Sequence, residues 1–177
     1  LDANLAYRRH FPAINWLLSY SLYNDKIGPY IEKNYKLEGW TELTSEAMKI
    51  LQKEDELQEI VRLVGIDALS EKDRWTLEVA KSLREDYLHQ NAFHEVDTYT
   101  SIEKQYKMLK LIIEMYNLGQ KALDKGVYLS KLTNLDVKEK IARAKYIPEN
   151  EMSKIDDIIS TLRSEMDTLM EGGTLDA

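Results

Sequence analysis

The sequence predicts an all-α fold, a helical bundle that contains a long helical hairpin. Apolar residues recur at steps of three and four over several long stretches, which is the spacing of one face of an α-helix. Only three prolines and seven glycines interrupt the 177 residues, so the helices should be long. No stretch shows the alternation of a half-buried strand, and no period of roughly 20 to 50 residues repeats.

Composition narrows the class of protein. With 44% hydrophobic and 31% charged residues, the chain is typical of soluble globular proteins, and no apolar run approaches the roughly 18 residues of a membrane span. The net charge of -7 argues against a nucleic-acid partner, and the absence of cysteine excludes disulfides and thiol chemistry. Because the chain begins at Leu1 without methionine, we expect it to be part of a longer protein.

The first 35 residues are the least helical in pattern. Residues 1–16 show no helical periodicity, and Pro12 both removes a backbone donor and pushes Phe11 toward an extended conformation. We therefore expect a short extended segment or ordered loop here. Residues 17–35 predict a short helix that is broken near Gly28 and Pro29.

The clearest signal is a pair of helices that forms the hairpin. The first spans residues 43–64 and ends at Gly65, and acidic residues within it, such as Glu54, indicate a solvated face. The second begins at Ser70, with Asp73 three residues later as in a capping box, and runs to about residue 88. The apolar positions of the first helix are Leu43, Ala47, Ile50, Leu51, Leu57, Ile60, Val61 and Val64.

Three further helices follow a polar interval over residues 89–100. Ser101 begins a helix that Gly126 ends, a short helix spans residues 136–146, and Pro148 opens the last helix, which reaches residue 171. The last helix carries apolar residues in the spacing of a coiled-coil seam, but over only about three heptads, which favours packing on the same bundle. These residues are Met152, Ile155, Ile159, Leu162, Met166 and Leu169.

The residues by themselves supply no complete active site. No glycine-rich loop followed by Lys and Ser or Thr is present to bind phosphates, and no serine or cysteine lies in a nucleophile motif. Asp86 and His89 have a spacing seen in di-iron bundles, but a second such pair is missing, so a solvated helix face is the better interpretation. We predict no catalytic residue and no metal site within the chain.

Three motifs together resemble a known family. They are "RRHFPAINWLLSYSLY" from residue 8, "LVGIDALSEKDRWTLEVAKSLREDYLHQNAF" from residue 63 and "EVDTYTSIEKQYKMLKLII" from residue 95. In this order they are similar to the C-terminal part of the catalytic A subunit of archaeal-type and vacuolar-type rotary ATPases. The resemblance implies that residues 1–16 are the trailing end of a nucleotide-binding domain and that residues 17–177 form the C-terminal helical domain.

The resemblance also implies a set of adenine contacts. Phe11 in "FPAINW" takes the place of an aromatic that stacks on adenine in the related F-type β subunit, and "QNAFHEVDTY" adds Phe93 and Tyr99. An aromatic face suits adenine because any base face can be stacked, which is worth about 1–3 kcal/mol. Without the resemblance, an isolated loop phenylalanine is more often a packing anchor.

The hairpin tip "DALSEKD" is similar to the "DELSEED" loop of the F-type β subunit, which faces the rotating shaft. Ala68 and Lys72 stand where that motif has glutamates, so pushing by the bulk of a stiff hairpin is favoured over specific charge pairing. The implied shaft-contact residues are Asp67, Ala68, Leu69, Ser70, Glu71, Lys72 and Asp73.

The function that the resemblance implies is ATP synthesis or hydrolysis coupled to proton or sodium movement. ATP or ADP with Mg would bind the complete subunit, whose phosphate loop lies upstream, so this chain alone should bind no cofactor and be inactive. The implied partners are non-catalytic B subunits in an alternating ring and a central-shaft subunit, in a complex whose peripheral part lies at the cytoplasmic face of the cell membrane. The alternative is a stand-alone helical adapter that binds proteins through its acidic faces and last helix.

Overall fold

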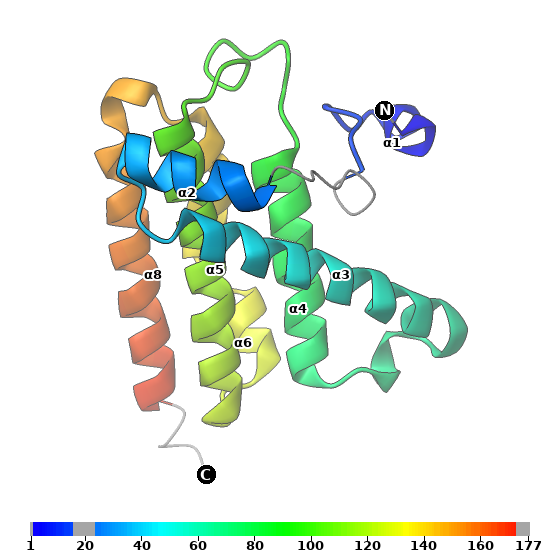
Figure 1. Ribbon diagram of the computed structural model, residues 1–177. Coiled ribbons are helices and arrows are strands. Elements are labelled where there is room, and N and C mark those ends of the chain that lie inside the picture. The colour runs from blue at the N-terminus through cyan, green and yellow to red at the C-terminus, as the bar shows by residue number, and fades with distance from the viewer. Residues whose placement is uncertain (1, 16–23, 173–177) are drawn as a thin grey trace.

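The computed structural model describes residues 2–15 and 24–172, and within them it contains helices, turns and loops but no strand. Figure 1 shows the longer helices packed beside one another, with the N-terminal segment standing to one side. The all-α prediction is confirmed. The expected domain boundary between residues 16 and 17 lies outside the described residues.

A short helix, α1 (Ala3–Tyr7), occupies the N-terminal segment. The Asp2 carboxylate caps it, accepting hydrogen bonds from the backbone N–H of Asn4 at 2.8 Å and of Leu5 at 3.2 Å. The expectation that residues 1–16 contain no helix is wrong for this turn, because a local cap stabilises a helix too short to show periodicity. The remainder of the described segment, residues 8–15, is irregular.

Helix α2 (Asn24–Tyr35) runs through Gly28 and Pro29 without a break, contrary to the expected interruption. Gly28 is buried against α3 (Trp40–Val64), and a Cβ atom there would lie 2.5 Å from Thr41 Oγ1. The glycine therefore permits close approach of two helices. A second contact, from the Thr41 N–H to Glu32 Oε1 at 2.8 Å, holds α2 across the start of α3 and satisfies an N–H group in the first turn of α3, which has no partner within its own helix.

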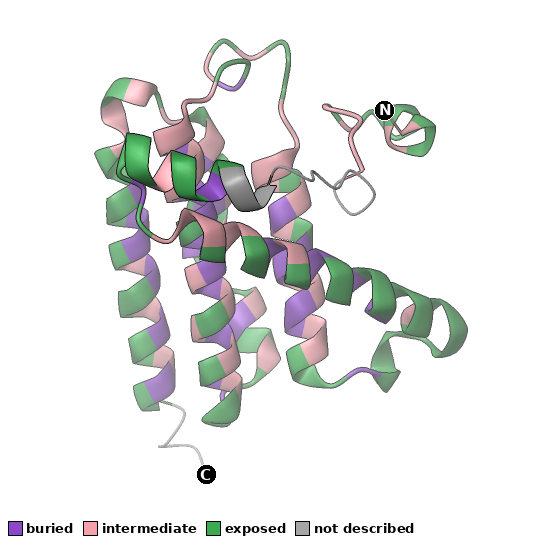
Figure 2. Cartoon of the chain, in the orientation of Figure 1, coloured by how far each residue is buried: buried purple, intermediate pink, exposed green. Residues whose placement is uncertain are grey.

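The expected hairpin is formed by α3, the short turn η1 (Ile66–Ala68), α4 (Glu71–Ser82) and a π-helical turn, η2 (Leu83–Leu88). Gly65 ends α3 as predicted. The two arms cross, and the last turns of α3 project beyond the other helices (Figure 1). Ile60 and Val64, expected on the buried face, are therefore exposed, as the green end of α3 in Figure 2 shows.

The rest of the bundle is built from α5 (Ile102–Asp124), α6 (Leu129–Thr133), α7 (Val137–Arg143) and α8 (Ser153–Gly172), with 3₁₀ turns η3 (Ala144–Tyr146) and η4 (Glu149–Glu151) between the last two. Helix α6 is too short to have been predicted. Helix α8 packs along α5, and Ile155, Leu162 and Met166 are fully buried in the bundle core, which confirms packing on the same bundle.

The start of α4 offers a direct test of the predicted cap. The Asp73 N–H donates to Ser70 Oγ at 3.1 Å, and the Ser70 hydroxyl donates to Asp73 Oδ2 at 2.8 Å. Because Ser70→Ala removes both bonds, we expect the free energy of unfolding to fall by about 1 kcal/mol in urea denaturation. Ser45→Ala, at an exposed site within α3, should change it by less than about 0.5 kcal/mol. Equal effects of the two substitutions would show that the cap contributes nothing.

Candidate functional site

The N-terminal segment and the loop of residues 89–101 meet at one end of the bundle, where two predicted site residues lie. The Gln90 N–H donates to the carbonyl oxygen of Phe11 at 2.7 Å. One residue earlier on each segment, the rings of His10 and His89 pack edge to face, with centroids 5.1 Å apart. The structure thus joins the segment that carries Phe11 to the loop that carries Phe93.

All three predicted adenine-contact residues present their side chains to solvent. Phe11 is 52% exposed, Tyr99 80% and Phe93 99%. Among the described residues, ring contacts join other aromatic pairs and none of these three. Phe93 and Tyr99 gain little from packing within the chain, and Phe11 is only about half-buried, so each ring has surface available to contact another molecule or another part of a larger protein.

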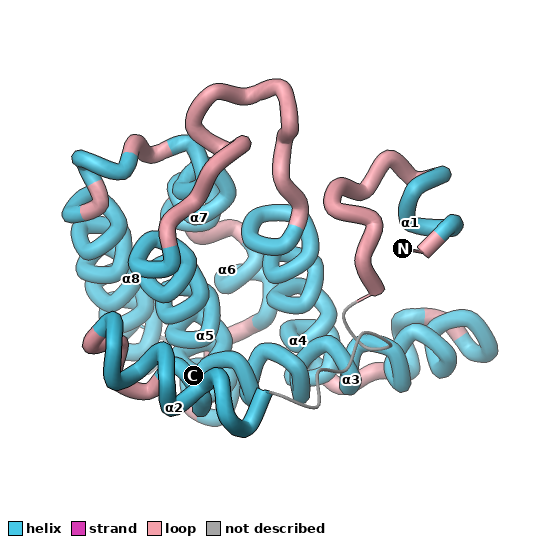
Figure 3. The backbone as a smooth tube through the Cα atoms, turned by 45° about the horizontal axis from the view of Figure 1, so that its top comes forward, coloured by secondary structure: helices cyan, strands magenta, loops and turns pink. Residues whose placement is uncertain are grey.

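The loop holds its own shape through hydrogen bonds within it. The carboxylate of Asp97, only 2% exposed, accepts from the Asn91 N–H at 2.5 Å, and Asn91 Oδ1 accepts from the Phe93 N–H at 3.1 Å. The His94 ring packs on Tyr146 of η3, with centroids 4.4 Å apart. These contacts fix the backbone on both sides of Phe93 while leaving its ring exposed. Figure 3 shows the loop that they hold as a long pink tube at the end of the bundle.

Two titratable groups lie where η2 leads into this loop. Burial raises the pKa of the Asp86 carboxyl, and a hydrogen bond from Ser82 partly opposes that rise. Burial lowers the pKa of His89, as do the nearby charge of Lys145 and the His10 ring, so His89 is neutral near pH 7. The Asp86 carboxylate accepts a hydrogen bond from Ser82, whereas the His89 ring packs on His10. Among the described residues, no group of three His, Asp or Glu could hold a metal ion.

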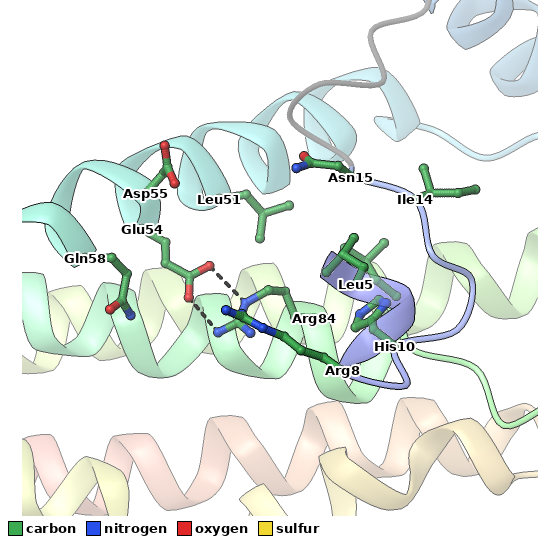
Figure 4. Close-up of a pocket in the computed structure, with 11 residues that line it drawn as sticks. Leu5, Arg8, His10, Ile14, Asn15, Leu51, Glu54, Asp55, Gln58 and Arg84 are labelled. Carbon is green, nitrogen blue, oxygen red and sulfur yellow. Dashed lines mark hydrogen bonds and ion pairs between the residues drawn. The ribbon is translucent and has the colours of Figure 1, made fainter. Parts of the chain in front are cut away.

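A cavity of about 470 Å³ separates the N-terminal segment from α3 and η2 (Figure 4). Arg84 donates to Glu54 through Nε at 3.0 Å and Nη2 at 2.6 Å, a two-point ion pair in its wall. Glu54 is buried, so its interpretation as part of a solvated face is wrong, because the partner thirty residues away brings it inside. Figure 4 shows Arg8 reaching from the end of α1 toward this pair.

The predicted shaft-contact residues do not share one environment. Asp67 pairs with Arg74 at 3.2 Å, and Lys72 pairs with Asp124 of α5. Leu69 is 7% exposed and faces the protein. Ala68, Glu71 and the cap of α4 complete the tip. Within the tip, Asp67 and Lys72 thus form ion pairs at the protein surface, and surface pairs of this kind contribute little free energy.

The residues at the end of α3 and the start of η1 form an exposed apolar surface, although the helical pattern predicted a buried position for Val64. Leu63 is 77% exposed, Val64 67% and Ile66 50%. The signal was present in the sequence, because "IVRLVGI" is more continuously apolar than one buried helix face requires. Within the described residues, no helix is both long and apolar enough to cross a membrane.

Comparison with known proteins identifies the family of this chain. Residues 30–133 match the family described as the C-terminal domain of V and A type ATP synthase. The chain is 60% identical over 177 residues to the V-type ATP synthase alpha chain of Thermoanaerobacter pseudethanolicus (strain ATCC 33223 / 39E) and 62% identical over 179 residues to that of Clostridium novyi (strain NT). Each alignment covers all of this chain and 30% of the relative. The chain thus spans about a third of the length of these relatives, and it belongs to the family of C-terminal domains of V and A type ATP synthases.

Proposed function

We propose that this chain is the C-terminal helical part of the catalytic subunit of a rotary ATP synthase, and that it supplies one wall of an adenine pocket. The observation that carries the proposal is the 2.7 Å hydrogen bond from Gln90 to Phe11, which unites two segments bearing exposed aromatic rings. Phe11 and Phe93 are the only phenylalanines of the chain, and they are carried by the two segments that this bond joins. Stacking on their faces would hold adenine without restricting the phosphate chemistry.

The hairpin would pass conformational change at the nucleotide site to a central-shaft subunit. Ala68 and Lys72 stand where the related motif has glutamates, and Lys72 pairs with Asp124 of α5, which supports pushing by shape over pairing with charges on the shaft. The apolar residues Leu63, Val64 and Ile66 extend the surface available for that contact. In the complete assembly, this subunit would alternate with non-catalytic B subunits, and rotation would accompany proton or sodium movement.

The phosphates of ATP or ADP and their Mg ion would be bound outside this chain. Its sequence has no phosphate-binding loop, and its described residues offer no group of three metal ligands. The chain alone should therefore not hydrolyse ATP. The assembled complex would hold it at the cytoplasmic face of the cell membrane. Family membership favours this proposal over a stand-alone helical adapter.

Replacing Phe11 with alanine in the full-length catalytic subunit tests the adenine wall. Loss of the stacking face should weaken ATP and ADP binding roughly 5- to 150-fold, because one base–aromatic stack is worth about 1–3 kcal/mol. Titration with a fluorescent adenine nucleotide measures the change. The Gln90 hydrogen bond uses the Phe11 carbonyl, so the substitution leaves that backbone contact possible.

The matched control is Tyr128→Ala, which removes another exposed aromatic ring, at the start of α6. Nucleotide affinity should be unchanged in this variant. Unaltered affinity in Phe11→Ala would rule out Phe11 as an adenine contact, and an equal loss in both variants would mean that the effect is unspecific.

A further inference from the structure

The turn from which the aromatic loop departs is held from outside its own helix. The π-helical turn η2 ends with the His89 N–H bonded to the Arg84 carbonyl at 2.8 Å, which leaves neighbouring carbonyls in need of donors. Lys145 Nζ donates to the Glu85 carbonyl at 2.9 Å and lies 3.5 Å from the His89 carbonyl. One ammonium group from η3 therefore binds the chain where η2 ends and the loop begins.

Lys145 is itself fixed by a second lysine. Lys104 of α5, whose side chain is fully buried, donates from Nζ to the Lys145 carbonyl at 2.7 Å. Burial lowers the pKa of Lys104, and the nearby carboxylates of Glu149 and Asp97 oppose that shift. A buried ammonium group costs free energy unless it is well bonded, so this arrangement fixes the backbone of η3 firmly on α5.

The segment around Lys145 also reaches the rest of the loop. Tyr146 packs on His94 in the middle of the loop. At its far end, Glu149 accepts hydrogen bonds from the N–H of Ser101 at 3.0 Å and from its hydroxyl at 2.6 Å. Residues 145–149 thus contact the loop at its start, middle and end.

We propose that Lys145 is a positioning residue for the adenine wall: it fixes the start of the loop from which Phe93 is presented and to which Phe11 is bonded. The path is short, since Lys145 binds the carbonyls of Glu85 and His89, and the next N–H along the chain, that of Gln90, holds the Phe11 carbonyl. Lys145 touches no nucleotide in this arrangement. The inference rests on the proposed function, because it assigns the loop its role in adenine binding.

The test is Lys145→Met in the full-length catalytic subunit assembled in its complex. Methionine keeps an unbranched apolar stem but removes the donor. The KM for ATP should rise roughly tenfold or more, as expected for loss of one charged hydrogen bond, while kcat stays within about twofold. Lys145→Arg, which can still donate to a carbonyl, should restore much of the affinity.

The matched control is Lys138→Met. Lys138 also joins two elements, pairing with Glu78 at 3.1 Å and donating to the Thr133 carbonyl at 3.3 Å, and neither partner belongs to the aromatic loop. Its KM should remain that of the unsubstituted protein. An unchanged KM in Lys145→Met, an equal rise in Lys138→Met, or failure of arginine to rescue would each overturn the proposal.

Amide hydrogen exchange separates this inference from the proposed function. Lys145→Met should accelerate exchange at the Gln90 amide in the nucleotide-free complex, and Lys138→Met should not. If Phe11→Ala leaves nucleotide affinity intact while Lys145→Met still accelerates this exchange, the adenine role fails and the anchoring of the loop survives. Unaltered exchange at Gln90 would refute the anchoring itself.

Discussion

Gly119→Ala should destabilise the protein by about 2 kcal/mol or more, although alanine ordinarily strengthens a helix interior. Gly119 lies within α5, and a Cβ atom there would come within 2.2 Å of the Trp75 indole. The indole cannot move aside easily, because it is fully buried and its Nε1–H donates to the Tyr116 carbonyl at 3.2 Å. Chemical denaturation followed by circular dichroism measures the loss.

Gly172→Ala is the matched control for this substitution. Gly172 is also helical, at the end of α8, and nothing lies within 4 Å of the added Cβ atom. The same chemical change should leave stability unchanged or raise it slightly. A stability of Gly119→Ala equal to that of the unsubstituted chain would show that the contact between α4 and α5 adjusts without cost.

Leu162→Ala should lower the free energy of unfolding by about 2–5 kcal/mol. Leu162 is fully buried, with an exposure of 0%, on the face of α8 that packs against α5. Truncation leaves a void that a close-packed core fills only in part. Urea denaturation gives the size of the loss.

Ser164→Ala, two residues further along α8 and exposed, provides the comparison. Its stability should change by less than about 0.5 kcal/mol. The pair distinguishes a helix that completes the bundle core from one reserved for a partner, since a small effect of Leu162→Ala would mean that α8 contributes little to the folded bundle.

Long helices could be predicted because their periodicity is a local property of the sequence. The spacing of Leu57 and its neighbours, the cap at Ser70 and the stop at Gly65 all act within a few residues. Helix α1 was not predicted, because five residues are too few to show a helical period, although aspartate at position 2 is a residue type that caps helices. The continuity of α2 through Pro29 depends on contact with α3, which no local pattern contains.

Residues of the candidate site could be predicted from the sequence only where they lie within a motif of the family. Phe11, Phe93 and the hairpin tip came from motif resemblance, and their functional roles stay predictions. The Glu54–Arg84 pair and the bonds of Lys145 join residues 30 or more positions apart, so no spacing rule could have found them. Sequence pattern identifies which helices exist, whereas burial and long-range hydrogen bonds decide which charges lie inside.

Because the hairpin arms cross, the last turns of α3 overhang the bundle and are joined to α4 through η1 (Figure 1). Leu57 is the last buried residue of this helix, and Glu54 one turn earlier is tied to Arg84. Seven residues, 58–64, follow Leu57 in the helix, so the part of α3 that overhangs the bundle is about 10 Å long at 1.5 Å per residue. A force applied at the tip would bend α3 most at the inner end of this overhang, where the Glu54–Arg84 pair and the buried Leu57 hold the helix against the rest of the protein.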